Sequence, residues 1–115
     1  MQVFYHLIYE YRKGVRNMML CTLPEDSEEK VKARLEKNNI CYMIQRLNNG
    51  NMNVFFGKEE CIIVAHNICK SRPLNLLTPE EDFIIGALLG YSICEQCQRY
   101  CKKQKNNKNT KVSLS

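Results

Sequence analysis

The chain has 115 residues, of which 44% are hydrophobic and 25% are charged. This composition is typical of a single globular domain with a modest core, and it excludes a chain that is disordered throughout. The formal net charge of +5 belongs to the end of the chain, because residues 102–115 hold five lysines and no acid. The body is therefore neutral, and its charge does not by itself indicate a nucleic-acid-binding protein.

The first third of the chain predicts a helix, a strand and a second helix. Apolar residues at helical spacing within residues 3–11 predict a helix that Gly14 ends, although alternation in the same segment leaves a short strand open. Residues 15–22 alternate between apolar and polar and predict a strand. A helix opens at Pro24 and closes at Asn38, and its narrow apolar stripe is typical of a surface helix.

A β-hairpin is the clearest local signal. Residues 40–47 and 52–56 are rich in β-branched, aromatic and other apolar residues, and they flank an Asn-Asn-Gly-Asn turn at 48–51. Gly57 marks the end of the second strand. Residues 58–70 then place apolar side chains on one face and predict a helix.

Two capping boxes predict the last two helices. Thr78 and Glu81 form one box around Pro79, which is a favoured first residue of a helix, so a helix is expected over 79–89. Ser92 and Glu95 form a second box, and the final helix is expected to run to about Lys103.

These elements predict an α+β fold. A central βαββα unit would form a small three-stranded antiparallel sheet with the two helices of the unit on one face. About five helices would cover the sheet, and the opening helix and final pair would cover an edge or form a partner surface. Residues 1–101 are expected to be one domain, and residues 102–115 a basic tail with too little apolar content to fold.

Three stretches carry a resemblance to a known family. They read Phe-Phe-Gly-Lys-Glu-Glu-Cys at 55–61, Arg-Pro-Leu-Asn-Leu-Leu-Thr-Pro-Glu-Glu-Asp-Phe at 72–83 and Leu-Gly-Tyr-Ser-Ile-Cys at 89–94. Over residues 1–101 the chain resembles an uncharacterised bacterial family, domain of unknown function 2023. The resemblance implies three strands, five helices and a homodimer. It implies no activity and no catalytic residues.

The location of the protein is predicted from what the sequence lacks. The longest apolar stretch is about half the ~20 residues that a membrane-spanning helix needs. The first residues lack the basic start and cleavage site of a signal peptide. Seven cysteines at irregular spacing favour reduced thiols in the cytoplasm over a disulfide framework.

Cys94, Cys97 and Cys101 share one face of the last predicted helix. In an unbroken helix the first and last of them are ~10 Å apart along the axis, at 1.5 Å per residue, so all three cannot bind one ion. A pair could hold zinc or an iron–sulfur cluster if His6, His66 or a second chain supplied further ligands.

The same thiols have two other interpretations. Cys94 falls in the first turn of its helix, where the dipole favours a thiolate and hence redox chemistry, but Glu95 opposes that charge. As small hydrophobes, the three cysteines would instead form a packing stripe. We therefore predict no cofactor, with zinc or an iron–sulfur cluster as the alternative.

The helix over 79–89 is apolar on nearly all sides and must be buried on all sides. Gly86 and Gly90 are four residues apart and would let another backbone approach closely. The economical solution is a homodimer whose interface contains Phe83, Gly86, Ala87 and Gly90. A central helix inside a compact monomer is the alternative.

No enzyme motif is present in the sequence: there is no glycine-rich phosphate loop, nucleophile elbow or HExxH helix. Tyr5, Tyr9, Tyr11 and Arg12 could line a groove with His6, although aromatic packing explains them more simply. We expect no nucleic-acid partner, because the body is neutral and the lysine tail can act as a solubilising extension. The predicted function is a non-enzymatic, cytoplasmic, homodimeric module that binds a protein or small ligand. The alternative is a thiol-based metal or electron-transfer protein.

Overall fold

The computed structural model describes residues 1–108, so residues 109–115 of the predicted tail lie outside the described part. Five helices and three strands follow one another as α1 (Gln2–Arg12), β1 (Met18–Pro24), α2 (Glu28–Lys37), β2 (Cys41–Arg46), β3 (Asn51–Gly57), α3 (Glu59–Cys69), α4 (Pro79–Leu88) and α5 (Ile93–Lys108). The α+β class is confirmed. None of the described helices combines the length and apolar character that crossing a membrane would require.

The three strands form one antiparallel sheet in the order β1-β3-β2. Phe55 of β3 lies opposite Leu20 of β1 on one side and Met43 of β2 on the other. The hairpin predicted between β2 and β3 is therefore present. Because β3 lies in the middle, β1 and β2 form the two edges of the sheet.

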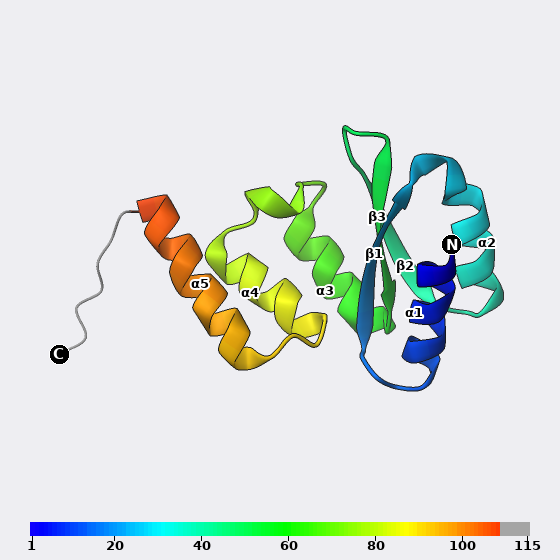
Figure 1. Cartoon of the computed structure of the whole chain (residues 1–115), viewed down its shortest axis with the longest axis horizontal. Coiled ribbons are helices and arrows are strands. Elements are labelled where there is room, and N and C mark those ends of the chain that lie inside the picture. The colour runs from blue at the N-terminus through cyan, green and yellow to red at the C-terminus, as the bar shows by residue number, and fades with distance from the viewer. Residues whose placement is uncertain (109–115) are drawn as a thin grey trace.

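Helices cover both faces of this sheet (Figure 1). Helices α1 and α2 pack on one face, called here the near face, and α3 packs on the other, the far face. Helices α4 and α5 are stacked outward from α3 in turn (Figure 1). The expectation that both helices of the βαββα unit share a face is wrong, because α2 and α3 lie on opposite sides.

The alternation of β3 explains why both faces are covered. Met52, Val54 and Phe56 point into the near-face core, while Phe55 points into the far-face core, and all four are fully buried. Successive side chains of a strand point to opposite faces, so an apolar run of this kind needs a helix on each side. Gly57 ends the strand where a side chain would collide with the Asn17 carbonyl.

Most helix ends follow the predicted caps, although α2 begins at Glu28, after a 3-10 turn over Glu25–Ser27, and not at Pro24 as expected. The Thr78 hydroxyl accepts from the Glu81 N–H at 3.1 Å, and the Glu81 carboxylate accepts from the Thr78 N–H at 2.9 Å. The Ser92 hydroxyl accepts from the Glu95 N–H at 3.1 Å. The end of α5 also differs, because this helix continues to Lys108, beyond the end expected near Lys103. The opening segment is a helix and not the alternative strand.

Candidate functional site

The three predicted thiol ligands all face outward from α5. Cys94, Cys97 and Cys101 are exposed and line one side of a shallow hollow with Lys102 and Lys105. Within residues 1–108, no three His, Cys, Asp or Glu side chains come together as a metal ion would require. The zinc or iron–sulfur alternative therefore stays a prediction that depends on ligands from elsewhere.

The other four cysteines are distributed over the layers of the fold. Cys21 and Cys69 are buried, and burial raises the pKa of both thiols, which keeps them protonated and unreactive. Cys61 is half-buried, whereas Cys41 is exposed at the start of β2. The interpretation of these four residues as core fillers fits the two buried ones and not Cys41.

The residues predicted for an α4 interface do not share one free face. A side chain at Gly86 would collide with Gln96 of α5, so this small-residue strip is already occupied within the chain. The Phe83 ring meets the Tyr100 ring of α5 edge-on, with centroids 6.4 Å apart. Ala87 is exposed, and Gly90 adopts the left-handed conformation that ends the helix.

Polar contacts hold α5 on α4. The Arg99 guanidinium donates to both carboxylate oxygens of Asp82, at 2.6 and 3.1 Å, and Lys103 Nζ lies 3.8 Å from the same carboxylate. The Gln96 amide donates to the Phe83 carbonyl at 3.4 Å. Helix α4 is thus covered partly by the next helix of its own chain.

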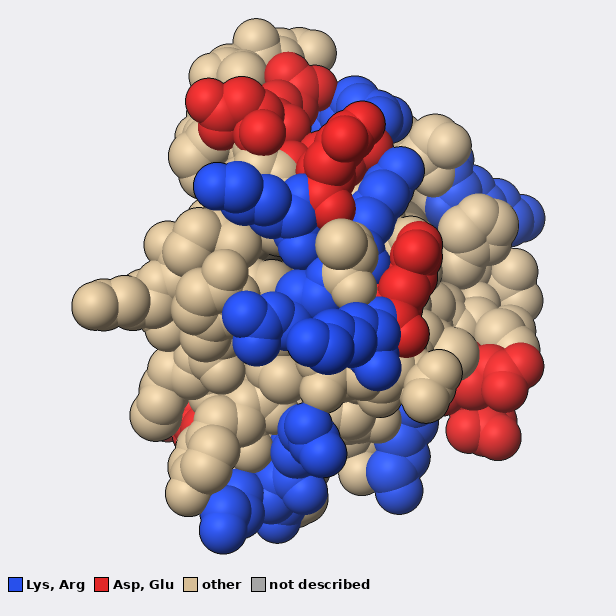
Figure 2. Space-filling model, turned by 90° about the vertical axis from the view of Figure 1, so that its right-hand side faces the viewer, with Lys and Arg blue, Asp and Glu red and all other residues tan. Residues whose placement is uncertain are grey.

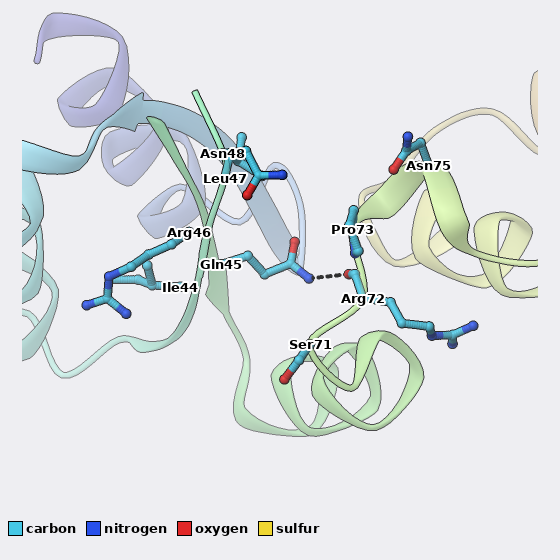
Figure 3. Close-up of a pocket in the computed structure, with 9 residues that line it drawn as sticks. All are labelled: Ile44, Gln45, Arg46, Leu47, Asn48, Ser71, Arg72, Pro73 and Asn75. Atoms are coloured by element: carbon cyan, nitrogen blue, oxygen red, sulfur yellow. Dashed lines mark hydrogen bonds between the residues drawn. The ribbon is translucent and has the colours of Figure 1, made fainter. Parts of the chain in front are cut away.

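A polar hollow of about 400 Å³ lies between the end of β2 and the loop that joins α3 to α4 (Figure 3). The Gln45 amide nitrogen donates to the Arg72 carbonyl at 2.9 Å and ties the loop to the sheet. Its amide oxygen is buried and accepts no hydrogen bond from any described residue. A buried acceptor without a donor costs roughly 1–3 kcal/mol.

Backbone strain occurs in the same loop. Lys70 and Ser71 both have positive φ, at 44° and 68°, although neither is glycine. Residues held in this region cost about 1–3 kcal/mol each and often mark functional sites. The Arg72 side chain holds the loop in place by donating to the Cys69 carbonyl at 3.3 Å and to the Glu81 carboxylate at 2.6 Å.

The charges around this hollow are balanced. The Glu81 carboxylate compensates the charge of Arg72. Hydrogen bonds from Arg72 and from the Thr78 N–H lower the pKa of Glu81 to about 2. Glu28 compensates Arg46 at 2.7 Å. The remaining polar lining comes from Asn48, Ser71 and Asn75 (Figure 3). The hollow therefore offers hydrogen bonds without net charge, which suits a neutral polar group.

The outer edge of β2 adjoins this hollow. Among the described residues, β2 pairs with β3 alone, so its second row of backbone groups has no strand beside it. The segment from Cys41 to Gln45 contains no charged residue and no proline. Next to it, α3 presents Ile63, which is 51% exposed, above a hollow lined by Tyr42 and Met43.

This edge was not predicted from the sequence. The hairpin signal predicts two strands but not which of them lies in the middle of the sheet. One signal was available: the apolar run from Val54 to Phe56 exceeds what an edge strand needs, and it indicates a central β3. Edge positions for β1 and β2 follow from that placement.

Two comparisons with known proteins complete this description. A family model described as "Protein of unknown function (DUF2023)" matches residues 2–103. No curated protein matches the chain.

Proposed function

Since the chain belongs to the DUF2023 family, whose description assigns no activity, we propose from its geometry that it is a non-enzymatic binding module that works as a homodimer. The dimer would form by antiparallel pairing of two β2 edges. The observation that carries this proposal is the uncovered, uncharged edge of β2.

An open sheet edge attracts another strand, because its free N–H and C=O groups are a template for pairing. Proteins that keep an edge free protect it with lysine, proline or a bulge. Cys41 to Gln45 contain neither lysine nor proline. A two-fold axis at Ile44 would pair this residue with its own copy and place Arg46 opposite Tyr42 of the second copy, so no like charges would meet.

The position of α3 supports the same seam. This helix packs over β2 and β3, and a two-fold axis at the β2 edge would bring both α3 helices to one face of the joined sheet. Ile63 of each copy would then flank the seam and lose its exposure to water. Burying an isoleucine side chain contributes roughly 1.5–3 kcal/mol.

The ligand site proposed with this dimer is the hollow beside Gln45. It adjoins the β2 edge, so the second chain would reach its rim. Amides and a hydroxyl line it, and both of its arginines are compensated by carboxylates. These features support a neutral polar ligand or a peptide group.

Light scattering at micromolar concentration tests the proposal with two matched variants. Ile63→Glu places a charge beside the β2 seam, and Ile84→Glu places one on α4, where the sequence predicted the interface. Both side chains are substantially exposed, at 51% and 42%, so neither change should unfold the monomer. We expect the wild type and Ile84→Glu to be dimers and Ile63→Glu to be a monomer.

Two results would contradict the proposal. A wild type with the mass of one chain would remove the dimer. Dissociation by Ile84→Glu and not by Ile63→Glu would move the interface to α4 and leave the β2 edge without a role.

A further inference from the structure

A second hollow, of about 510 Å³, lies on the near face between α1 and α2. It is lined by two tyrosines, three cations, an isoleucine and an asparagine: Tyr5, Ile8, Tyr9, Arg12, Lys13, Arg34 and Asn38. We call it the α1–α2 groove. Figure 2 views the molecule from this side and shows Lys and Arg side chains gathered across the middle of the face.

The three cations of the groove lack carboxylate partners. Within the described residues, Arg12, Lys13 and Arg34 form no ion pair. Two acids on these helices are engaged elsewhere: Glu10 lies 3.2 Å from His6, and Glu36 accepts from the Tyr42 hydroxyl at 2.7 Å. The groove therefore carries uncompensated positive charge on a body that is neutral as a whole.

The cations are held in position before any ligand arrives. Arg12 donates to the Asn38 side-chain oxygen at 2.8 Å, and the Asn38 amide donates to the Arg34 carbonyl at 2.8 Å. The Arg34 guanidinium lies 4.4 Å from the centre of the Tyr5 ring. Fixing long side chains in advance removes much of the entropy that binding would otherwise cost.

Side chains of the same protein already contact the faces of both tyrosine rings. Lys13 Nζ lies 5.3 Å from the Tyr9 ring centre, and the His6 ring is stacked on the same tyrosine at 6.5 Å. Because these cations and His6 already contact the rings, recognition in the groove would depend on charge and hydrogen bonds more than on stacking. This arrangement is suited to a compact anion with several oxygens.

A structural explanation exists for part of this arrangement. Arg12 and Arg34 lie in the last turns of α1 and α2, where positive charge offsets the helix dipole. That effect accounts for a cation at each helix end. It does not require three cations from two helices to converge on one hollow, nor an asparagine side chain that links the Arg12 guanidinium to the Arg34 backbone carbonyl.

We propose that the α1–α2 groove binds the phosphate group of a small phosphorylated molecule. Arginine and lysine are the side chains best suited to phosphate oxygens, and the volume of the groove is in the range of small-molecule sites. The site lies on the opposite face of the sheet from α3. It does not depend on the proposed dimer or on the neutral hollow beside Gln45.

The test is an NMR titration of the ¹⁵N-labelled full chain with two probes, pyrophosphate and glycerol 3-phosphate. We expect amide shifts that saturate and that lie at the ends of α1 and α2. Arg12→Gln and Arg34→Gln should each weaken binding about tenfold, because each removes a charge-assisted hydrogen bond. Lys58→Gln is the matched control, since it removes an exposed cation at the start of α3.

The two probes distinguish the source of the phosphate. Binding of pyrophosphate alone would identify a free anion as the ligand, and binding of both would identify an ester. Thermal melts of the arginine variants check that α1 and α2 remain folded. The proposal is overturned if neither probe shifts the groove at millimolar concentration. Equal weakening by Lys58→Gln, or shifts centred on the lysines of α5, would also overturn it.

Discussion

The two faces of the sheet are covered in different ways. On the near face, α1 and α2 both pack directly on the strands and share one core of eleven buried residues with them. On the far face α3 covers the sheet, α4 adds Ile85 and Leu89 to the core behind it, and α5 forms the outermost layer (Figure 1). The near-face helices are thus held by apolar contact with the sheet, and α5 is held by another helix.

The difference appears in the burial of α5. Within residues 93–105 of this helix, Gln96 is the only buried residue. The contacts of α5 with α4 are ion pairs and hydrogen bonds, among them Arg99 with Asp82, together with the edge-on contact of Tyr100 with Phe83. With so little apolar burial in α5, the outer layer should open well before the sheet does.

The largest expected losses of stability come from two adjacent phenylalanines of β3, of which Phe56 points to the near face and Phe55 to the far face. Phe56→Ala should lower the free energy of unfolding by about 4 kcal/mol and Phe55→Ala by about 3 kcal/mol. The difference arises because Phe56 also makes edge-on contacts with the rings of Phe4 and Tyr11. Urea unfolding measures both. A larger loss for Phe55→Ala would reverse the comparison between the faces.

An intermediate effect is expected at Gly86. Gly86→Ala should displace Gln96, because the new methyl group would occupy the position of its amide. Such overpacking costs about 1–3 kcal/mol, and the better helix propensity of alanine returns about 1 kcal/mol of it. Hydrogen exchange should show faster exchange in α5 and unchanged exchange in α1.

Ala87→Leu serves as the control for Gly86→Ala, because the neighbouring Ala87 is exposed and a larger side chain can extend into solvent there. It should leave exchange in α5 unchanged. If Gly86→Ala accelerates exchange equally in α1 and α5, the two faces unfold as one unit and the comparison fails.

The smallest expected effect is a pH dependence of folding stability that arises from Glu81 on the far face. Arg72 and the Thr78 N–H hold the pKa of Glu81 at about 2, against 4.5 for an ordinary glutamate. Because the folded pKa is the lower one, this stabilisation is complete above pH 4.5 and is lost as the pH falls to 2. Wild type should therefore be more stable than Glu81→Gln at pH 6, and this difference should shrink towards pH 2.

Glu28→Gln supplies the near-face control for this titration. A hydrogen bond from Lys32 and the charge of Arg46 also lower the pKa of Glu28. Thermal melts of both variants between pH 6 and pH 2.5 compare the faces. A Glu81→Gln variant whose deficit stays constant over this range would show that the carboxylate charge contributes nothing to the far face.

Local signals in the sequence predicted most of the elements. The Asn-Gly turn, the box at Thr78 and the spacing in residues 3–11 depend on neighbouring residues, and each is present in the structure. The packing of Gln96 on Gly86 was not predictable in this way. It depends on the angle between α4 and α5, which no short-range pattern encodes.

The two hollows were predicted to different degrees. The sequence suggested a groove of Tyr5, Tyr9, Tyr11 and Arg12 with His6, all in one helix. Tyr5, Tyr9 and Arg12 do line the hollow, whereas Tyr11 packs on Phe56 and His6 stacks on Tyr9 outside it. Arg34 belongs to α2, so it reaches the groove only because α1 and α2 pack on the same face of the sheet. The sequence had placed α2 and α3 together instead, and the pairing of α1 with α2 was therefore not predicted. The hollow beside Gln45 lies between segments that are 27 residues apart in the sequence, so no short-range pattern predicts it.

The exposed thiol at the β2 edge has a practical consequence. Four of the seven cysteines are exposed, three on α5 and one, Cys41, beside the proposed seam. Alkylation with iodoacetamide, followed by peptide mass spectrometry, measures the labelling of each cysteine and would therefore show whether the unmodified sequence forms the dimer. The α5 thiols would label rapidly in any state, whereas Cys41 would be shielded only while two sheets are joined.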